Sequence, residues 1–445
     1  MALIVLLVYA VAFIIAATTV LKLHPFLALL AAAFGYGILC RALSLQQVID
    51  AINEGFGDTI SKIGIVILAG AIIGVFLERS GGAYRLAERI LRVTGRGNVP
   101  LTMGVMGYIV SIPVFCDSGF VILSPLGRAL ARETGASAAA AAMALSFGLY
   151  ATHTMVPPTP GPVAAAGMLN ADLGLVILLG LAVSVPVMLA GWMFAVLCAP
   201  RVVPGEAAEI AKDGPEVPAD APSALRAALP IVAPLVLIVT HSAARLPSHP
   251  FGEEACAALL QFAGHPVVAL LLGASLACSL PPRRKAELYS MRGWVGDAVL
   301  AAAVIIIVTG AGGSFGKILE ASGIAGVVQE NLGAARLGVW LPFLAAAALK
   351  TAQGSSTVAI ITTAGIVAPL LEPLGLDEPA GRALTVIAIG AGSMVVSHAN
   401  DSYFWVVTQL SGLSVSQGYR LQTLGTLVQG IVAILAVWAL TGILL

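Results

Sequence analysis

Charged residues are scarce in this chain. Lysine, arginine, aspartate and glutamate together make up 10% of its 445 residues, against about 25% in a soluble domain. Such a sequence cannot cover a soluble enzyme with polar surface, and its apolar runs recur at the roughly 17–25 residues that cross a bilayer. The charges sum to zero, so no basic field favours nucleic acid as a partner. The composition predicts an all-α polytopic membrane protein embedded in a lipid bilayer.

Cysteines and cofactor motifs are also scarce. The five cysteines are scattered without metal-type spacing, and we interpret them as small buried hydrophobes. The sequence contains neither a Gly-rich loop ending in GK[ST] nor HExxH, the motifs of ATP and zinc chemistry. We therefore expect no cofactor, no metal, no use of ATP and no enzyme activity. The apolar run 2–20 lacks the basic start and cleavage site of a signal peptide, and we interpret it as the first span.

The apolar runs form two sets of five candidate spans. They lie at about 2–20, 25–41, 59–77, 136–153 and 171–199, and at about 226–243, 264–280, 294–312, 380–397 and 421–444. The Pro-rich and acidic segment 201–225 separates the two sets and predicts a cytoplasmic linker. The chain is thereby divided into a first half, 1–200, and a second half, 226–445.

Two further apolar runs are interrupted near their middle by a polar patch. The run 99–127 contains SIPVFCDSG at 111–119, and the run 338–369 contains TAQGSST at 351–357. Irregular backbone at membrane depth is tolerated only where it is buried in protein or lines a wet cavity. We expect two re-entrant helical hairpins, at about 99–130 and 338–370, in addition to about ten spans.

The distribution of charge predicts that the two halves are inverted repeats. The segment 78–98 carries five arginines, whereas its counterpart 317–337 carries one lysine and one arginine; the preceding segments reverse this, with none in 42–57 and four in 281–293. Cytoplasmic loops carry the excess of Lys and Arg, so equivalent loops lie on opposite sides of the membrane. That arrangement is common among secondary transporters.

The first half has polar clusters at two expected helix breaks. Asp117, Ser118 and Gly119 lie in the first patch, where a freed helix N-terminus suits a carboxylate ligand. Asp117 could carry a coupling proton, coordinate substrate hydroxyls or only cap the helix. His153 and Thr154 come just before four prolines within 157–162, where the helix must unwind. His153 is either a proton carrier or a hydrogen-bonded buried ring.

The second half has matching clusters. Their polar residues are Gln353, Gly354, Ser355, Ser356 and Thr357 at the hairpin tip, and His398, Asn400 and Asp401 at the end of a span. The tip offers donors to a polyhydroxy acid, and Lys350 just before it either pairs with a carboxylate or snorkels to the interface. Asp401 could hold a proton if desolvated. We expect all these residues to form one substrate site with the first-half clusters, with Asp117, His153, His398 and Asp401 as candidate proton carriers.

Five motifs resemble a known family. They are FGDTISKIGIVILAGAIIGVFLERSGGA at 56–83, IPVFCDSGFVIL at 112–123, HTMVPPTPGP at 153–162, AQGSSTVAIITTAG at 352–365 and SHANDSYFW at 397–405. In this order they resemble the gluconate permease (gluconate/proton symporter, GntP-type) family of bacteria, within the ion-transporter superfamily. The resemblance implies a scaffold domain, a mobile transport domain with two hairpins, a homodimer and elevator-type motion in the bacterial inner membrane.

The function that we expect is proton-coupled uptake of gluconate, or of a related sugar acid or small hydroxy monocarboxylate, by alternating access. Alternatives are a sodium-coupled, D-serine or glycerate carrier of the same fold, or a channel. An intramembrane hydrolase using Ser355 or Ser356 with His398 is a third class, but the tip lacks the G-x-S-x-G elbow.

Overall fold

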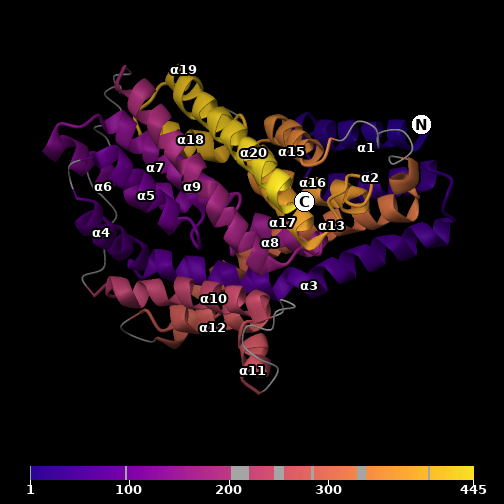
Figure 1. Ribbon diagram of the computed structural model, residues 1–445, viewed down its shortest axis with the longest axis horizontal. Helices are drawn as coiled ribbons and strands as arrows, with labels where there is room; N and C mark the ends of the chain where they lie inside the picture. The colour runs from indigo at the N-terminus through magenta and orange to yellow at the C-terminus, as the bar shows by residue number, and fades with distance from the viewer. Residues whose placement is uncertain are drawn as a thin grey trace.

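The chain is all-helical in the computed structural model, which describes residues 2–95, 98–201, 220–244, 255–281, 285–327, 337–398 and 401–445. Within these ranges there is no β-strand, which confirms the predicted all-α class. Figure 1 shows the long helix α3 (Leu45–Arg79) running across the molecule, with α10, α11 and α12 on one side of it and most other helices on the opposite side.

The centre of the fold is a pair of long helices, α3 and α13 (Trp294–Ala321), which pack along each other. Their backbones meet at two glycines. A Cβ atom on Gly55 would lie 2.5 Å from the carbonyl oxygen of Gly313, and one on Gly313 would lie 2.6 Å from the carbonyl oxygen of Gly55. Because neither position has room for a side chain, the helices approach to backbone contact, as small residues allow in membrane helix pairs.

Shorter helices surround this pair. α2 (Pro25–Leu39) packs on α13 and on α1 (Ala2–Thr19), while α12 (Pro266–Cys278) packs on α3 and on α10 (Ala224–Ala244). The other helices of the first half are α4 (Gly82–Thr94), α5 (Val99–Val110), α6 (Cys116–Thr134), α7 (Ala138–His153), α8 (Pro160–Met168) and α9 (Leu173–Cys198), followed by the short η1 (Ala199–Arg201). Those of the second half are α11 (Ala255–Ala263), η3 (Ala286–Tyr289), α15 (Trp340–Gln353), α16 (Ser356–Val367), η5 (Ala368–Leu370), α17 (Pro379–Met394), α18 (Ser402–Leu410), α19 (Val415–Gly418), the π-helical η6 (Tyr419–Thr423) and α20 (Leu424–Leu444).

Helix breaks occur at all four predicted places. α5 ends before 111–115 and α6 follows, inside the patch 111–119; α15 ends and α16 begins inside the patch 351–357. The members of each pair also pack against each other. α7 stops at His153 before the prolines, and α17 stops at Met394 before the segment that leads to α18. The same order of broken pairs, each series ending in one long helix (α9 or α20), therefore occurs in both halves.

Two segments expected to be loops are partly helical, so this expectation was wrong. Most of 42–57 belongs to α3, because a reciprocal capping box starts the helix early: the Gln47 N–H donates to Ser44 Oγ (3.3 Å) and the Ser44 N–H donates to Gln47 Oε1 (2.8 Å). The arginine-rich segment 78–98 contains α4.

Four stretches among the described residues are long and apolar enough to cross a bilayer: Leu173–Cys198, Ala224–Ala244, Ala286–Ala321 and Val415–Leu444. α3 makes a fifth if its two parts, bent by 45° between Lys62 and Gly64, count as one span. Several other predicted spans form helices of 13 to 16 residues, because the chain breaks or turns at their ends. The count of about ten spans stays a prediction, and most of the linker 201–225 lies outside the described residues.

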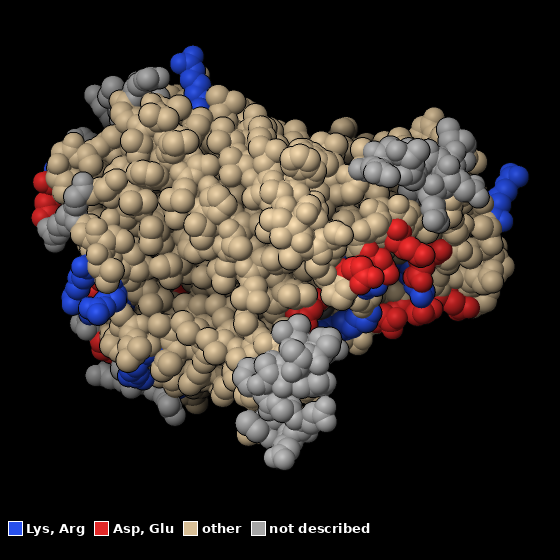
Figure 2. Space-filling model, viewed as in Figure 1, with Lys and Arg blue, Asp and Glu red and all other residues tan. Residues whose placement is uncertain are grey.

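The outer surface is apolar over a wide area. Figure 2 shows the middle of one face, over α9 and α20, without Lys, Arg, Asp or Glu, whereas charged side chains gather toward the edges. Large apolar side chains project from these helices, among them Leu189 and Met193 of α9 and Leu435 and Trp438 of α20. An apolar patch of this extent is typical of a surface that faces lipid.

Candidate functional site

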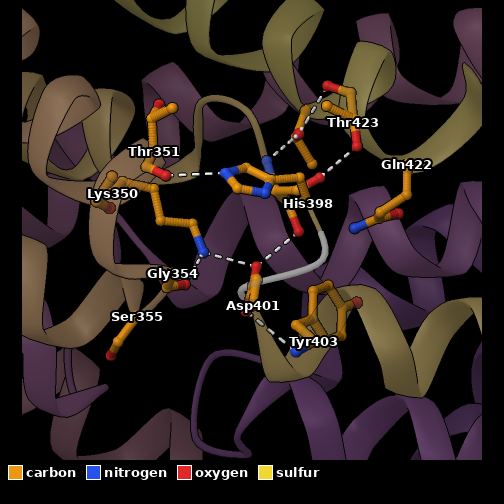
Figure 3. Close-up of polar contacts among 12 residues, drawn as sticks. Lys350, Thr351, Gly354, Ser355, His398, Asp401, Tyr403, Gln422 and Thr423 are labelled. Atoms are coloured by element: carbon orange, nitrogen blue, oxygen red, sulfur yellow. Dashed lines mark hydrogen bonds and ion pairs between the residues drawn. The ribbon is translucent and has the colours of Figure 1, made fainter. Parts of the chain in front are cut away.

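A buried ion pair lies where the broken helices of the second half meet. Lys350 Nζ of α15 is 2.6 Å from Asp401 Oδ2, and the two side chains are 0% and 6% exposed. Figure 3 shows the lysine reaching across from α15 to the aspartate that precedes α18. Taking two charges out of water costs several kcal/mol per ion unless both are well paired. Lys350 therefore does not snorkel: it pairs with a carboxylate of the chain itself.

The end of α15 completes the surroundings of Lys350. Its ammonium also donates to the carbonyl oxygen of Gly354, and it lies 5.9 Å from the centre of the Tyr150 ring. Gly354 can end the helix with this carbonyl turned back toward the lysine because its φ is +85°, a conformation that other residues adopt at a cost. The hairpin tip thus contributes a backbone oxygen to the site.

The carboxylate of Asp401 is held by two further groups. Oδ2 accepts a hydrogen bond from Ser397 Oγ (2.6 Å), and Oδ1 accepts one from the Tyr403 N–H (3.0 Å), so that Asp401 caps the N-terminus of α18. The preceding break is strained, since Val396 has a φ of +56°, which is rare for a β-branched residue and typical of functional sites. His398 Nε2 lies 2.8 Å from the carbonyl oxygen of Thr351, which ties the same break to α15 a second time (Figure 3).

The start of α20 supports this break from the other side. Thr423 Oγ1 donates to the Ser397 carbonyl (2.6 Å), and the Ser397 N–H donates to Thr426 Oγ1 (3.1 Å). The turn that carries Gln422 and Thr423 is π-helical, a feature frequent at functional sites. Gln422 Oε1 accepts from Ser146 Oγ (2.9 Å), but its Nε2 is buried without a hydrogen-bond partner among the described residues.

The first half brings Asp117 and His153 to the same region. Both interact electrostatically with Lys350 and Asp401. Asp117 lies in the first turn of α6 and His153 ends α7; Asp117 Oδ1 and His153 Nδ1 are buried without a hydrogen-bond partner in the described part of the chain. A buried polar atom without a partner is costly, so these two atoms are candidate ligand contacts. Asp117 and His153 of the first half thus lie within electrostatic range of Lys350 and Asp401 of the second half; that these residues form one substrate site stays a prediction.

Several predicted residues have bonds or contacts that stabilise the helices. The Thr154 hydroxyl donates to the Tyr150 carbonyl (3.2 Å), and Ser355 Oγ accepts from the Val358 N–H (3.3 Å) as the N-cap of α16. A Cβ on Gly119 would lie 2.6 Å from Leu149, so this glycine allows α6 to approach α7. Ser118 interacts with Glu78 of α3.

The remaining predicted residues are placed less fully. Ser356 begins α16 close to the Tyr150 hydroxyl, and Thr357 follows it, partly exposed. Gln353 ends α15, but its side chain is not among the described ones, and Asn400 lies outside the described residues.

Sequence reasoning did not name two contributors to the site, Tyr150 and Gln422. It placed Lys350 beside the hairpin tip, with pairing to a carboxylate as one of two alternatives, and Ser397 at the start of the motif 397–405. Gln422 had a detectable signal. Gln422, Thr426 and Gln429 follow one another at helical spacing in an otherwise apolar helix, and all three are 0% exposed. Such a stripe places three polar groups on one buried face. The pairing of Lys350 with Asp401 had no such signal, because 51 positions separate the two residues.

A buried charged site at helix breaks, inside a chain with a lipid-type surface, defines a membrane transport protein. Comparison with known proteins agrees: residues 1–443 match the model of the GntP family permeases. The chain belongs to this family, which confirms the resemblance seen in the sequence and the expectation that the protein is a permease, not an enzyme.

Individual relatives cover most of the chain. It is 34% identical over 409 residues to the gluconate permease of Pseudomonas aeruginosa, covering 90% of this chain and 89% of the relative. It is 31% identical over 445 residues to the gluconate permease of Zymomonas mobilis, covering 98% and 97%. The crystal structure of the YdaH transporter of Alcanivorax borkumensis superposes with a TM-score of 0.66 at 16% identity, covering 94% of this chain and 99% of that one. This last likeness concerns the fold alone.

Proposed function

We propose that this chain is a secondary active transporter that takes up gluconate, or a related sugar acid or small hydroxy monocarboxylate, together with protons by alternating access. The observation that carries the proposal is the similarity, over nine-tenths of the chain, to a permease named for gluconate. The site supports a small acid as cargo, because it combines one buried cation with several buried polar groups. Polar groups of this kind inside a membrane protein mark substrate and proton pathways.

The substrate site that we propose lies between the two hairpin tips and the two later helix breaks. It comprises Asp117, Ser118, Gly119, His153 and Thr154 of the first half, and Gln353, Gly354, Ser355, Ser356, Thr357, His398, Asn400 and Asp401 of the second half. Asp117, His153, His398 and Asp401 are the candidate proton carriers. The unpartnered atoms of Asp117 and His153 support direct contact with the ligand, whereas Gly119 and Thr154 act through packing and hydrogen bonds within the helices.

The architecture that we propose consists of two inverted repeats, 1–200 and 226–445, joined by a cytoplasmic linker at 201–225. Each repeat contributes about five spans and one re-entrant hairpin. The repeated order of broken helices and the reversed distribution of Lys and Arg between equivalent segments support this arrangement. A multi-pass location in the bacterial inner membrane and a homodimer complete the proposal.

Uptake by the purified protein in proteoliposomes tests the function. Labelled gluconate is added outside while the interior is kept more alkaline than the exterior, with sodium absent. We expect accumulation above the outside concentration that a protonophore abolishes, because one pH unit is worth about 1.4 kcal/mol, or about tenfold, for each coupled proton. Uptake that ignores the pH gradient and requires sodium would contradict proton coupling, and uptake that never exceeds equilibration would favour a channel.

A further inference from the structure

The cation best placed to receive a carboxylate is already occupied. Lys350 is the only Lys or Arg among the described residues whose side chain is 0% exposed, and it is neutralised by Asp401 at 2.6 Å. Asp117 adds a second acidic group that interacts with both. An anionic substrate entering this site unchanged would add a negative charge to a buried region that already holds two carboxyl groups and one ammonium. Charge balance therefore requires a change of partners or of protonation.

We propose that Lys350 is the ligand of the substrate carboxylate and that Asp401 occupies the place of this carboxylate when the site is empty. When substrate binds, its carboxylate pairs with Lys350 Nζ, and Asp401 takes up one proton from the side that delivers the substrate. When the substrate leaves on the other side, Asp401 releases the proton there and pairs with Lys350 again. This inference rests on the proposed function and specifies how transport of the substrate is coupled to transport of the proton.

The exchange balances charge at every step. The empty site holds the lysine cation and the aspartate anion; the loaded site holds the lysine cation, the substrate anion and a neutral Asp401. The sum over these groups is the same, so one proton accompanies each monocarboxylate and the transport cycle moves no net charge. Direct contact of the two anions with one lysine, without protonation, would leave an excess charge buried.

The hydrogen bonds around Asp401 suit both of its forms. As a carboxylate it accepts from Ser397 Oγ at 2.6 Å and from the Tyr403 N–H at 3.0 Å. As a neutral acid its new O–H, on Oδ2, can donate to Ser397 Oγ, because a hydroxyl both donates and accepts and its hydrogen rotates. Oδ1 can keep its bond from the Tyr403 N–H. Ser397 is thus a positioning residue for the proton.

Other titratable groups also face Asp401, and the assignment of the proton depends on comparing them. They are Cys116 and Asp117 of α6, Tyr150 and His153 of α7, Lys350 of α15 and Tyr403 of α18. His398 belongs to the same break as Asp401, and its carbonyl oxygen accepts from the Asp401 N–H. Asp117 is the main rival as proton carrier because its Oδ1 has no hydrogen-bond partner among the described residues. However, Asp401 is the only acidic group in the described part of the chain that forms an ion pair with Lys350, so a substrate carboxylate that pairs with Lys350 displaces the charge of Asp401.

Proton uptake on binding is the direct measurement. Gluconate is added to purified protein in a weakly buffered detergent solution that contains a pH indicator, and bound gluconate is measured in parallel by calorimetry. We expect the wild type to take up one proton for each gluconate that it binds. Asp401→Asn should still bind gluconate but take up no proton. Asp117→Asn should take up one proton per bound gluconate, like the wild type. Lys350→Gln should bind about 10- to 100-fold more weakly, as loss of a charge-assisted contact predicts. Lys285→Gln and Asp50→Asn, at exposed positions, serve as matched controls and should behave as the wild type.

Two measurements on the unaltered protein keep the test decisive if a variant does not fold. Gluconamide, which has no carboxylate, should not compete with gluconate, and gluconate uptake driven by a pH gradient should not respond to an imposed membrane potential. The inference is overturned if gluconamide competes equally, if uptake is electrogenic, or if Asp117→Asn abolishes proton uptake while Asp401→Asn retains it. Failure of the wild type to accumulate gluconate would instead overturn the proposed function itself.

Discussion

Replacing Lys350 by methionine removes one charge of the buried ion pair and leaves the other without a partner. Met has a similar length and no charge, so the change tests electrostatics more than volume. Asp401 would keep its bonds from Ser397 and the Tyr403 N–H but lose the ammonium at 2.6 Å. Breaking a buried pair on one side costs about 3–5 kcal/mol. No discount for solvent screening applies, because the side chains are 0% and 6% exposed.

The corresponding fall in melting temperature is small but measurable. An unfolding entropy of about 2.1 cal/mol/K per residue gives about 0.9 kcal/mol/K for a chain of 445 residues. A loss of about 3–5 kcal/mol then lowers Tm by about 3–5 °C. This shift can be measured in detergent by static light scattering during heating. It can also be measured as the fraction of protein that still elutes as a folded peak in size-exclusion chromatography after heating.

The double variant Lys350→Met/Asp401→Asn decides whether the cause is the unpaired charge. Replacing both partners of a buried pair is commonly neutral or stabilising, so the double variant should recover most of the lost stability. A double variant that is as unstable as the sum of the two single variants would refute the reasoning, because the two residues would then act independently.

Three further changes test other parts of the structure. Gly354→Ala should destabilise by about 1–2 kcal/mol, because its φ of +85° disfavours a side chain, and should weaken gluconate binding in the same calorimetric assay. Gly55→Ala should lower the free energy of unfolding by about 1–3 kcal/mol, measured by thermal unfolding, because its Cβ would lie 2.5 Å from the Gly313 carbonyl oxygen. The matched control is Gly57→Ala, where the added Cβ has nothing within 4 Å; this change should be neutral or stabilising. Gln422→Leu should reduce gluconate affinity by about 2- to 10-fold, the worth of one hydrogen bond; unchanged affinity would mean that its free Nε2 does not meet the ligand.

The sequence predicted the helix breaks because the residues that cause them are local. Four prolines follow His153, and the patches 111–119 and 351–357 interrupt apolar runs. The positions at which helices end could therefore be predicted without a structure. The early start of α3 was missed, since the capping box at Ser44 and Gln47 lies in polar sequence that resembles a loop. Polar residues before an apolar run do not reveal whether the helix extends beyond the bilayer.

The contacts that define the site could not be predicted, because they join residues that are distant in the chain. Lys350 and Asp401 belong to two different polar clusters, and composition does not show which residue of one cluster pairs with which residue of the other. Only the packing of α15 against α17 brings the end of α15 next to the break that follows α17. Local pattern therefore supplied the candidates, and tertiary packing chose between pairing and snorkelling for Lys350.

The two acidic residues of the site have similar positions but different surroundings. Asp117 lies in the first turn of α6 and Asp401 caps α18, so each sits at a helix N-terminus, which stabilises a negative charge by about 0.3–1 kcal/mol. That contribution is common to both and cannot distinguish them. The difference is the cation: Asp401 contacts Lys350, whereas Asp117 interacts with it only at longer range. In the proposed exchange, Asp401 is the carboxylate among the described residues that is placed to give way to a substrate carboxylate on this lysine, and the two halves of the chain would then have unequal parts in transport.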